Sequence, residues 1–267
     1  MFSKFRLWKN DKSEKMKDEL NYNNIEELLN NLPDNFKILE ETIDIEIQKE
    51  FFDSAQNIQF SADSDTIAEL IDQLNDSNTK LEDKKLVLQK LSMTDSVESF
   101  RAIENFRKDP PVELKDWTVL AFQQSQMIIQ SSLLEEQQVF ISTGLGGKLD
   151  KLRYFLIFPY ASRLDIDEIQ KEMLKKELSF VLEQNNGELE EIEFLYGYAT
   201  AFALIPLNIF VSDMIKDILL ECNQYGHYLT EDVIITNIKK FNHEEILEIL
   251  KKYEQQNKSG SSGSTTI

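Results

Sequence analysis

A short glycine-rich segment, followed by basic residues, is the part of this sequence whose residue types could bind a charged ligand. Three glycines fall within four positions, after 143 residues without any glycine. Glycines let backbone amides approach an anion, and lysine or arginine side chains supply the opposite charge. We therefore consider a site for a carboxylate or a phosphate. Its candidate residues are Gly144, Gly146, Gly147, Lys148, Lys151, Arg153 and Arg163.

The same segment departs from the two common phosphate-binding loops. A Walker loop has a glycine five positions before its Gly-Lys pair and a hydroxyl residue after the lysine, where this chain has Ser142 and Leu149. A dinucleotide-binding loop also needs a glycine in place of Leu149 and a helix afterwards, whereas a strand is expected here. A turn that requires positive φ angles is the simpler explanation of the glycines, and the anion site is the alternative.

The chain offers few groups for nucleophilic or metal chemistry. Cys222 is its single cysteine, and His227 and His243 are its histidines. Cys222 falls on the apolar stripe of its expected helix, so we predict a buried structural thiol. The acids of residues 165–172 are explained by helix capping and by the helix dipole. We therefore expect no catalytic residue, no metal site and no cofactor, which favours a protein without enzyme activity.

The charge of the chain limits its partners. It has 48 Asp and Glu against 29 Lys and Arg, a formal net charge of −19. Nucleic-acid affinity rests on neutralising phosphates with basic side chains, so we expect no nucleic-acid partner. A basic protein would be attracted instead. A single cysteine allows no internal disulfide, which fits a reducing cytoplasm.

One uncharged run, Phe194–Val211, spans 18 residues, the lower end of the length of a transmembrane helix. The run contains Gly197 and Pro206, and no cluster of Lys or Arg flanks it. We therefore expect strands or a buried helix here, and no association with a membrane.

The N-terminal half has apolar residues at helical spacing, and we assign residues 21–137 to an all-helical domain after a flexible basic tail, 1–20. Asp95 with Glu98 predicts a helix cap, and the run from Asp109 to Pro111 separates two helices. Residues 64–134 resemble the helical hairpins of HEAT and armadillo proteins; a small bundle is the alternative. That resemblance implies a protein-binding surface. The apolar stripes include Ile67, Leu70, Leu74, Val87, Leu88, Leu91, Val97, Phe100, Ile103, Leu114, Trp117 and Leu120.

After residue 138 the pattern changes to strands that alternate with helices. Segments 139–142 and 152–158 are expected to be strands joined as a hairpin, the second of them central and covered on both faces. Helices are expected over 165–184, after Ser212 and after Asn242, with strands between 190 and 207. The order indicates two ββα units in tandem, so residues 138–255 form an α+β domain. Residues 256–267 are a flexible Gly/Ser tail.

These observations lead to three functional hypotheses. The first is a non-catalytic protein-binding or adaptor protein. The second is an acidic immunity or chaperone-like binder of a basic partner, because acids outnumber bases most strongly over residues 18–135. The third is a domain that binds a small anionic ligand, or acts on one, at the hairpin from Gly144 to Lys148.

Overall fold

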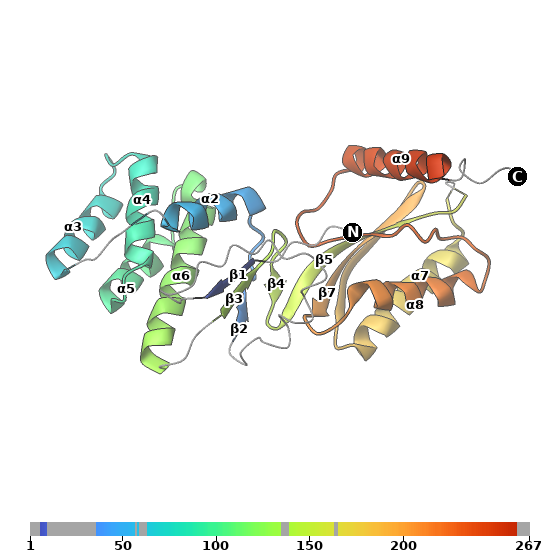
Figure 1. Ribbon diagram of the computed structural model, residues 1–267, viewed down its shortest axis with the longest axis horizontal. Helices are drawn as coiled ribbons and strands as arrows, with labels where there is room; N and C mark the ends of the chain where they lie inside the picture. The colour runs from blue at the N-terminus through green and yellow to red at the C-terminus, as the bar shows by residue number, and fades with distance from the viewer. Residues whose placement is uncertain are drawn as a thin grey trace, which may run out of the picture. The chain divides into compact units, whose positions relative to one another are not determined.

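The computed structural model describes residues 6–9, 36–56, 58, 63–134, 139–162 and 165–260. The fold is α+β, as predicted (Figure 1). The chain divides into two compact units, an N-terminal one over Lys4–Leu149 and a C-terminal one that begins at Asp150. This division lies later in the chain than the predicted boundary between residues 137 and 138.

The N-terminal unit is built around a bundle of helices. These are α2 (Ile45–Gln56), α3 (Ser64–Asn75), α4 (Leu81–Ser92), α5 (Val97–Phe106), a 3-10 turn (Val112–Leu114) and α6 (Lys115–Leu134). Helix α6 packs against α2, α4 and α5, and α3 packs against both α4 and α5. The helices therefore share one core, which includes Phe51, Leu74, Leu88, Leu91 and Ile103. In a helical repeat each unit contacts only its neighbours, whereas here α2 packs against α6, with α3, α4 and α5 between them in the chain. The bundle is the correct alternative here, and the HEAT or armadillo interpretation is wrong.

Local sequence signals set the helix boundaries in this bundle. Asp63 caps α3 by accepting a hydrogen bond from the Thr66 backbone N–H at 2.9 Å. Helix α5 is capped by Ser96, one residue after the predicted cap at Asp95. The two prolines after Asp109 separate α5 from α6, as the sequence indicated, because proline ends one helix and fits the start of the next.

A three-stranded sheet completes the N-terminal unit. Strand β3 (Val139–Ser142) lies between β1 (Arg6–Lys9), which is antiparallel to it, and β2 (Phe36–Ile38), which is parallel. Strand β1 lies within the segment expected to be a flexible tail. Because β3 pairs with strands from early in the chain, the predicted hairpin from β3 into the next long strand is wrong, and so are the tandem ββα units.

The C-terminal unit is a four-strand, two-helix arrangement followed by a third helix. In chain order its elements are β5 (Lys151–Pro159), α7 (Glu168–Gln184), β6 (Glu188–Leu195), β7 (Tyr198–Pro206), α8 (Val211–Asn223), β8 (Ile234–Thr236) and α9 (His243–Gly260). Within this unit the strands pair in the order β8-β5-β7-β6, with every neighbouring pair antiparallel. This βαββαβ topology is the ferredoxin-like, split βαβ arrangement.

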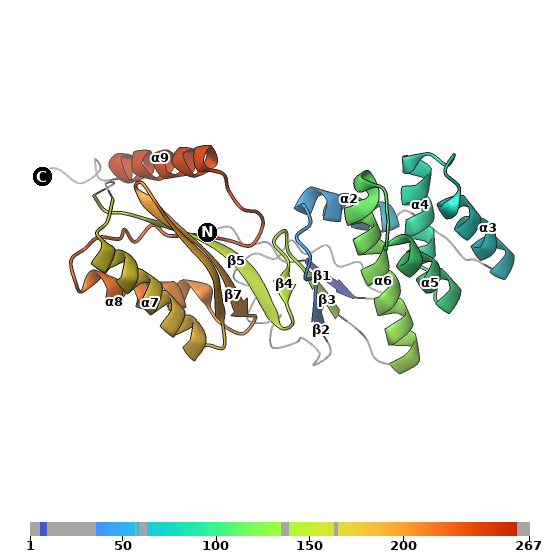
Figure 2. The ribbon, with the colours of Figure 1, turned by 180° about the vertical axis from the view of Figure 1, so that it is seen from behind.

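Helices cover this sheet on both sides. Figures 1 and 2 show α7 and α8 against one face and α9 on the other, the outer face. The face under α7 and α8 is apolar and carries alternate residues of β5, which are buried against the leucines of α7. Strand β5 is therefore central and covered on both faces, as predicted. These face residues are Leu152, Tyr154, Leu156, Phe158, Ala199, Ala201 and Ala203.

The uncharged run from Phe194 to Val211 forms the end of β6, all of β7 and the first residue of α8. In the described ranges, no helix has both the length and the apolar character that crossing a membrane requires. Of the two alternatives expected for this run, strands or a buried helix, the strands are the correct one.

Candidate functional site

Two phenylalanines lie side by side on the outer face of the C-terminal sheet. Phe155 of β5 and Phe202 of β7 are register partners in an antiparallel pair, and their ring centroids are 4.9 Å apart at an interplanar angle of 44°. Strands β5 and β7 are the two central strands of the sheet. Phe155 is 1% exposed, whereas Phe202 is only half-buried. The pair is therefore a fixed aromatic surface of which the Phe202 ring is the accessible part.

Charged groups lie beside this aromatic pair. Arg153, two residues before Phe155 on β5, donates to both carboxylate oxygens of Glu190, from Nε at 2.6 Å and from Nη2 at 2.9 Å. Glu191 and Glu193 of the edge strand β6 are the register partners of Phe202 and Thr200, and both are exposed. Opposite residues in an antiparallel pair share a face, so these carboxylates border the Phe202 ring.

The segment that connects β8 to α9 crosses the same face. Lys240 places its ammonium 5.3 Å from the centroid of the Phe202 ring. Three residues later, His243 Nδ1 and the Tyr198 hydroxyl share a hydrogen bond of 2.5 Å. Asn242 caps α9, because its side chain accepts from the Glu245 backbone N–H and Glu245 accepts from that of Asn242, each at 2.9 Å. The cap predicted at Asn242 is confirmed.

The Tyr198 and His243 pair resembles a nucleophile beside a base, but its environment opposes that use. Burial, with a smaller contribution from the Glu193 carboxylate, raises the pKa of the Tyr198 phenol above its ordinary value. A raised pKa keeps the phenol protonated and makes it a poor nucleophile. The pair therefore fastens α9 to β7.

Close packing explains one glycine of the segment, Gly146. Gly146 has φ of +67°, and a Cβ there would lie 2.4 Å from the Glu40 carbonyl oxygen and 2.6 Å from that of Glu41. The Thr143 hydroxyl donates to the Gly146 carbonyl, and Gln48 Nε2 donates to the Thr143 carbonyl. Residues 143–147 are buried. Glycine is thus required at residue 146 by backbone conformation and by lack of space.

The basic residues of the predicted anion site occupy separate surroundings. Lys148 is exposed at the end of the N-terminal unit, in β4 (Gly147–Lys148), and Lys151 opens β5 in the C-terminal unit. The charge of Arg153 is compensated by Glu190. Arg163 lies outside the described residues. A site formed by these residues with Gly144, Gly146 and Gly147 stays a prediction.

The candidates for nucleophilic and metal chemistry have structural explanations. Cys222 is buried, as predicted, and burial raises the pKa of its thiol. Asp167 forms a capping box with Gln170 at the start of α7. Across the described ranges, no group of three or more His, Cys, Asp and Glu side chains is placed to hold a metal ion.

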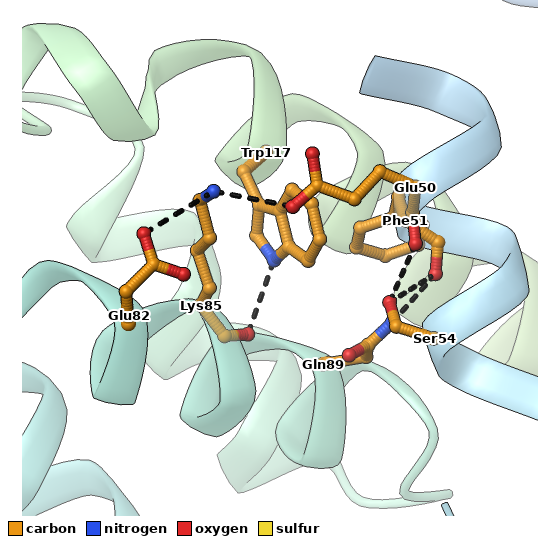
Figure 3. Close-up of polar contacts among 7 residues, drawn as sticks. All are labelled: Glu50, Phe51, Ser54, Glu82, Lys85, Gln89 and Trp117. Atoms are coloured by element: carbon orange, nitrogen blue, oxygen red, sulfur yellow. Dashed lines mark hydrogen bonds and ion pairs between the residues drawn. The ribbon is translucent and has the colours of Figure 1, made fainter. Parts of the chain in front are cut away.

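A group of polar contacts among the helices of the N-terminal unit is drawn in Figure 3. Lys85 of α4 lies 5.0 Å from the Trp117 ring centroid and forms ion pairs with Glu50 at 3.3 Å and Glu82 at 3.5 Å. The Trp117 indole N–H donates to the Lys85 carbonyl at 3.0 Å, and Gln89 donates to a carbonyl and a hydroxyl of α2. These contacts tie α2, α4 and α6 together, and Trp117 is 4% exposed. The cluster is structural.

Comparisons with known proteins give only distant structural likenesses. No protein-family model and no curated protein matches the chain. A candidate transposase from Deinococcus radiodurans R1 shows 20% identity and a TM-score of 0.32, covering 41% of this chain and 94% of that protein. A REP-associated tyrosine transposase bound to a REP hairpin shows 12% identity and a TM-score of 0.30, covering 40% of this chain and 63% of that protein.

Three expectations find no support in these likenesses. Both proteins are named as transposases and neither as a helical repeat, and the HEAT and armadillo resemblance is not kept. The expectation of a non-catalytic adaptor that binds proteins is withdrawn on the same finding. One of these proteins is bound to a REP hairpin, and the expectation of no nucleic-acid partner is not kept. The identities and TM-scores are too low to transfer either protein's activity to this chain.

The sequence reasoning missed Phe155, Phe202, Tyr198 and Lys240 as members of a site. Segment 152–158 was recognised as a strand that is apolar on both faces, and that was the available signal. An outer sheet face that carries a phenylalanine on each central strand stands out only after the two strands have been paired.

Proposed function

We propose that the C-terminal unit binds single-stranded nucleic acid on the outer face of its sheet, with the Phe202 ring as the surface on which a base stacks. The observation that carries the proposal is the pairing of Phe155 and Phe202 on the two central strands. Four-stranded sheets that bind single-stranded RNA stack bases on aromatic side chains of this kind.

Phe155 and Phe202 differ in burial, and we therefore assign them different roles in binding. Phe155 is 1% exposed and offers no free face, but it holds the Phe202 ring in place. A base that stacks on a fixed ring need not pay for ordering that side chain. Stacking of a base on an aromatic ring contributes about 1–3 kcal/mol. Phe202 therefore supplies the largest single contact with a base in this proposal.

The charges around Phe202 orient the nucleic acid. Glu191 and Glu193 on β6 repel phosphates, whereas Lys240 enters the face from the connection to α9. We infer that the phosphates lie on the side of Lys240 while the bases point toward β6, whose carboxylates can accept hydrogen bonds from amino groups of bases. With few cations in contact, the affinity should depend only weakly on salt.

The test compares substitution of Phe202, on the outer face of the sheet, with substitution of Phe180, on helix α7. Fluorescence anisotropy measures binding of labelled RNA and DNA single strands of about eight nucleotides, a length within the usual range of such sites. Phe202→Leu should weaken binding by about tenfold, the factor that corresponds to about 1.4 kcal/mol of lost stacking. The matched control is Phe180→Leu on α7, a side chain that is 57% exposed, and it should bind as the wild type does.

Two results would contradict the proposal. The first is wild-type protein that fails to bind any single strand at low salt. The second is an equal effect of both substitutions. Thermal unfolding of each variant shows whether a loss of binding reflects a loss of structure.

A further inference from the structure

The connection between β8 and α9 follows strand β7 in the reverse direction. We call residues Lys239–His243 the strap. Lys240 lies over Phe202, and His243 is bonded to Tyr198, which precedes Phe202 on the same strand. Residues 198 and 202 are an even number of positions apart, so their side chains share the outer face. The strap therefore covers the surface that the proposed function assigns to a nucleic-acid base.

Lys240 and a stacked base need the same face of the same ring. One side of the Phe202 ring is taken by Phe155, and the Lys240 ammonium is 5.3 Å from its centroid. A cation over an exposed phenyl ring is a weaker contact than a base stacked on it. Binding of a base is therefore expected to displace Lys240, which leaves its ammonium free to meet a phosphate.

The contacts of the strap are unequal along its length. At its end, His243 is bonded to Tyr198, the capping box of Asn242 and Glu245 starts α9, and Ile246 is buried. Asn237 lies two residues before the strap and is fully buried. Neither its Oδ1 nor its Nδ2 atom has a hydrogen-bond partner in the described part of the chain. An unsatisfied buried amide is costly, and movement of the segment would open it to water.

We propose that the strap is an autoinhibitory cover. Without nucleic acid, Lys240 occupies Phe202 and the Tyr198 to His243 hydrogen bond holds α9 down. When a base stacks on Phe202, the strap lifts and the start of α9 moves with it. This inference rests on the proposed function, because the displacing ligand is a single-stranded nucleic acid.

The experiment loosens the strap without touching the stacking surface. In the full chain, Tyr198→Phe removes the hydroxyl that bonds His243 and leaves the Phe202 ring unchanged. Because the contribution of one such hydrogen bond is modest, affinity for the same labelled strand should rise by about threefold to tenfold. His243→Gln should act in the same direction from the other side of the bond. The matched control, Tyr196→Phe, changes a tyrosine that is 68% exposed in the turn after β6 and should leave affinity unchanged.

Hydrogen exchange supplies the second measurement. Amides in the first turns of α9 should exchange faster in Tyr198→Phe, and faster in wild-type protein after the strand is added. One set of results would contradict the autoinhibitory role of the strap alone. In that case Tyr198→Phe and His243→Gln bind the strand as the wild type does, and hydrogen exchange in α9 does not change on binding. If Phe202→Leu still loses affinity, the proposed binding face is retained. If no strand binds the wild-type protein, both proposals are wrong.

Discussion

A lysine lies over an aromatic ring in both units of this chain, and the two contacts differ in what surrounds them. In the N-terminal bundle, Lys85 lies over Trp117, forms ion pairs with two glutamates and accepts the indole N–H at its carbonyl. In the C-terminal unit, Lys240 is exposed and lies over the half-buried Phe202 ring. The first contact is closed by several further bonds, whereas the second is the contact that we propose a nucleic-acid base replaces. The surroundings of a cation and ring pair therefore decide whether the contact is fixed in the fold or open to replacement.

The largest effect should come from removing the aromatic ring of the closed contact. Trp117→Ala should destabilise the chain by about 3–5 kcal/mol, because it leaves a cavity among α2, α4 and α6. Chemical denaturation followed by circular dichroism measures the change. Leu133→Ala, at a side chain that is 74% exposed, is the control and should be nearly neutral. A Trp117→Ala protein as stable as the wild type would show that the Figure 3 cluster does not hold the bundle together.

A smaller effect is expected at the glycine segment. Gly146 and Gly226 both have positive φ, at +67° and +110°, but a Cβ meets backbone atoms only at Gly146. In both alanine variants the strained backbone conformation lowers the unfolding free energy by about 1 kcal/mol or more. In Gly146→Ala the clash with the Glu40 and Glu41 carbonyls lowers it further. Gly146→Ala should therefore lower the unfolding free energy more than Gly226→Ala does. Equal losses would mean that the close approach to residues 40 and 41 is unimportant.

The smallest effect on stability separates the two lysines directly. Lys85→Met should cost about 1 kcal/mol, since it removes the ion pairs with Glu50 and Glu82 beside a buried ring. Lys240→Met should leave the unfolding free energy unchanged and instead alter the affinity for a single strand. Denaturation and anisotropy on both variants give the comparison. If Lys240→Met were the more destabilising of the two, the open contact would be structural and the comparison would fail.

Much of the local structure could be predicted from the sequence, because its signals lie within a few residues. The apolar spacing of Val97, Phe100 and Ile103 located α5, and Asn242 with Glu245 located the start of α9. The partners of a strand are another matter. Segment 139–142 reads as a strand, but its pairing with residues 6–9 and 36–38 depends on contacts more than a hundred residues away in sequence.

The candidate site could not be predicted for the same reason. Phe155 and Phe202 are ordinary apolar residues of two strands until the register brings them together, and Lys240 meets Phe202 only after the chain has passed through α8 and β8. The glycine cluster stands out in the sequence because three glycines within four positions form a local pattern. The close approach of Gly146 to Glu40 and Glu41, which explains that glycine, is not local.

The central claim is that Phe202 is a stacking surface for a single-stranded nucleic acid. The most direct measurement is the ratio of the dissociation constants of Phe202→Leu and Phe180→Leu for one labelled single strand at low salt. The account predicts that Phe202→Leu binds about ten times more weakly than Phe180→Leu, with both proteins folded. Equal dissociation constants, or no binding by either variant or by the wild type, would contradict it.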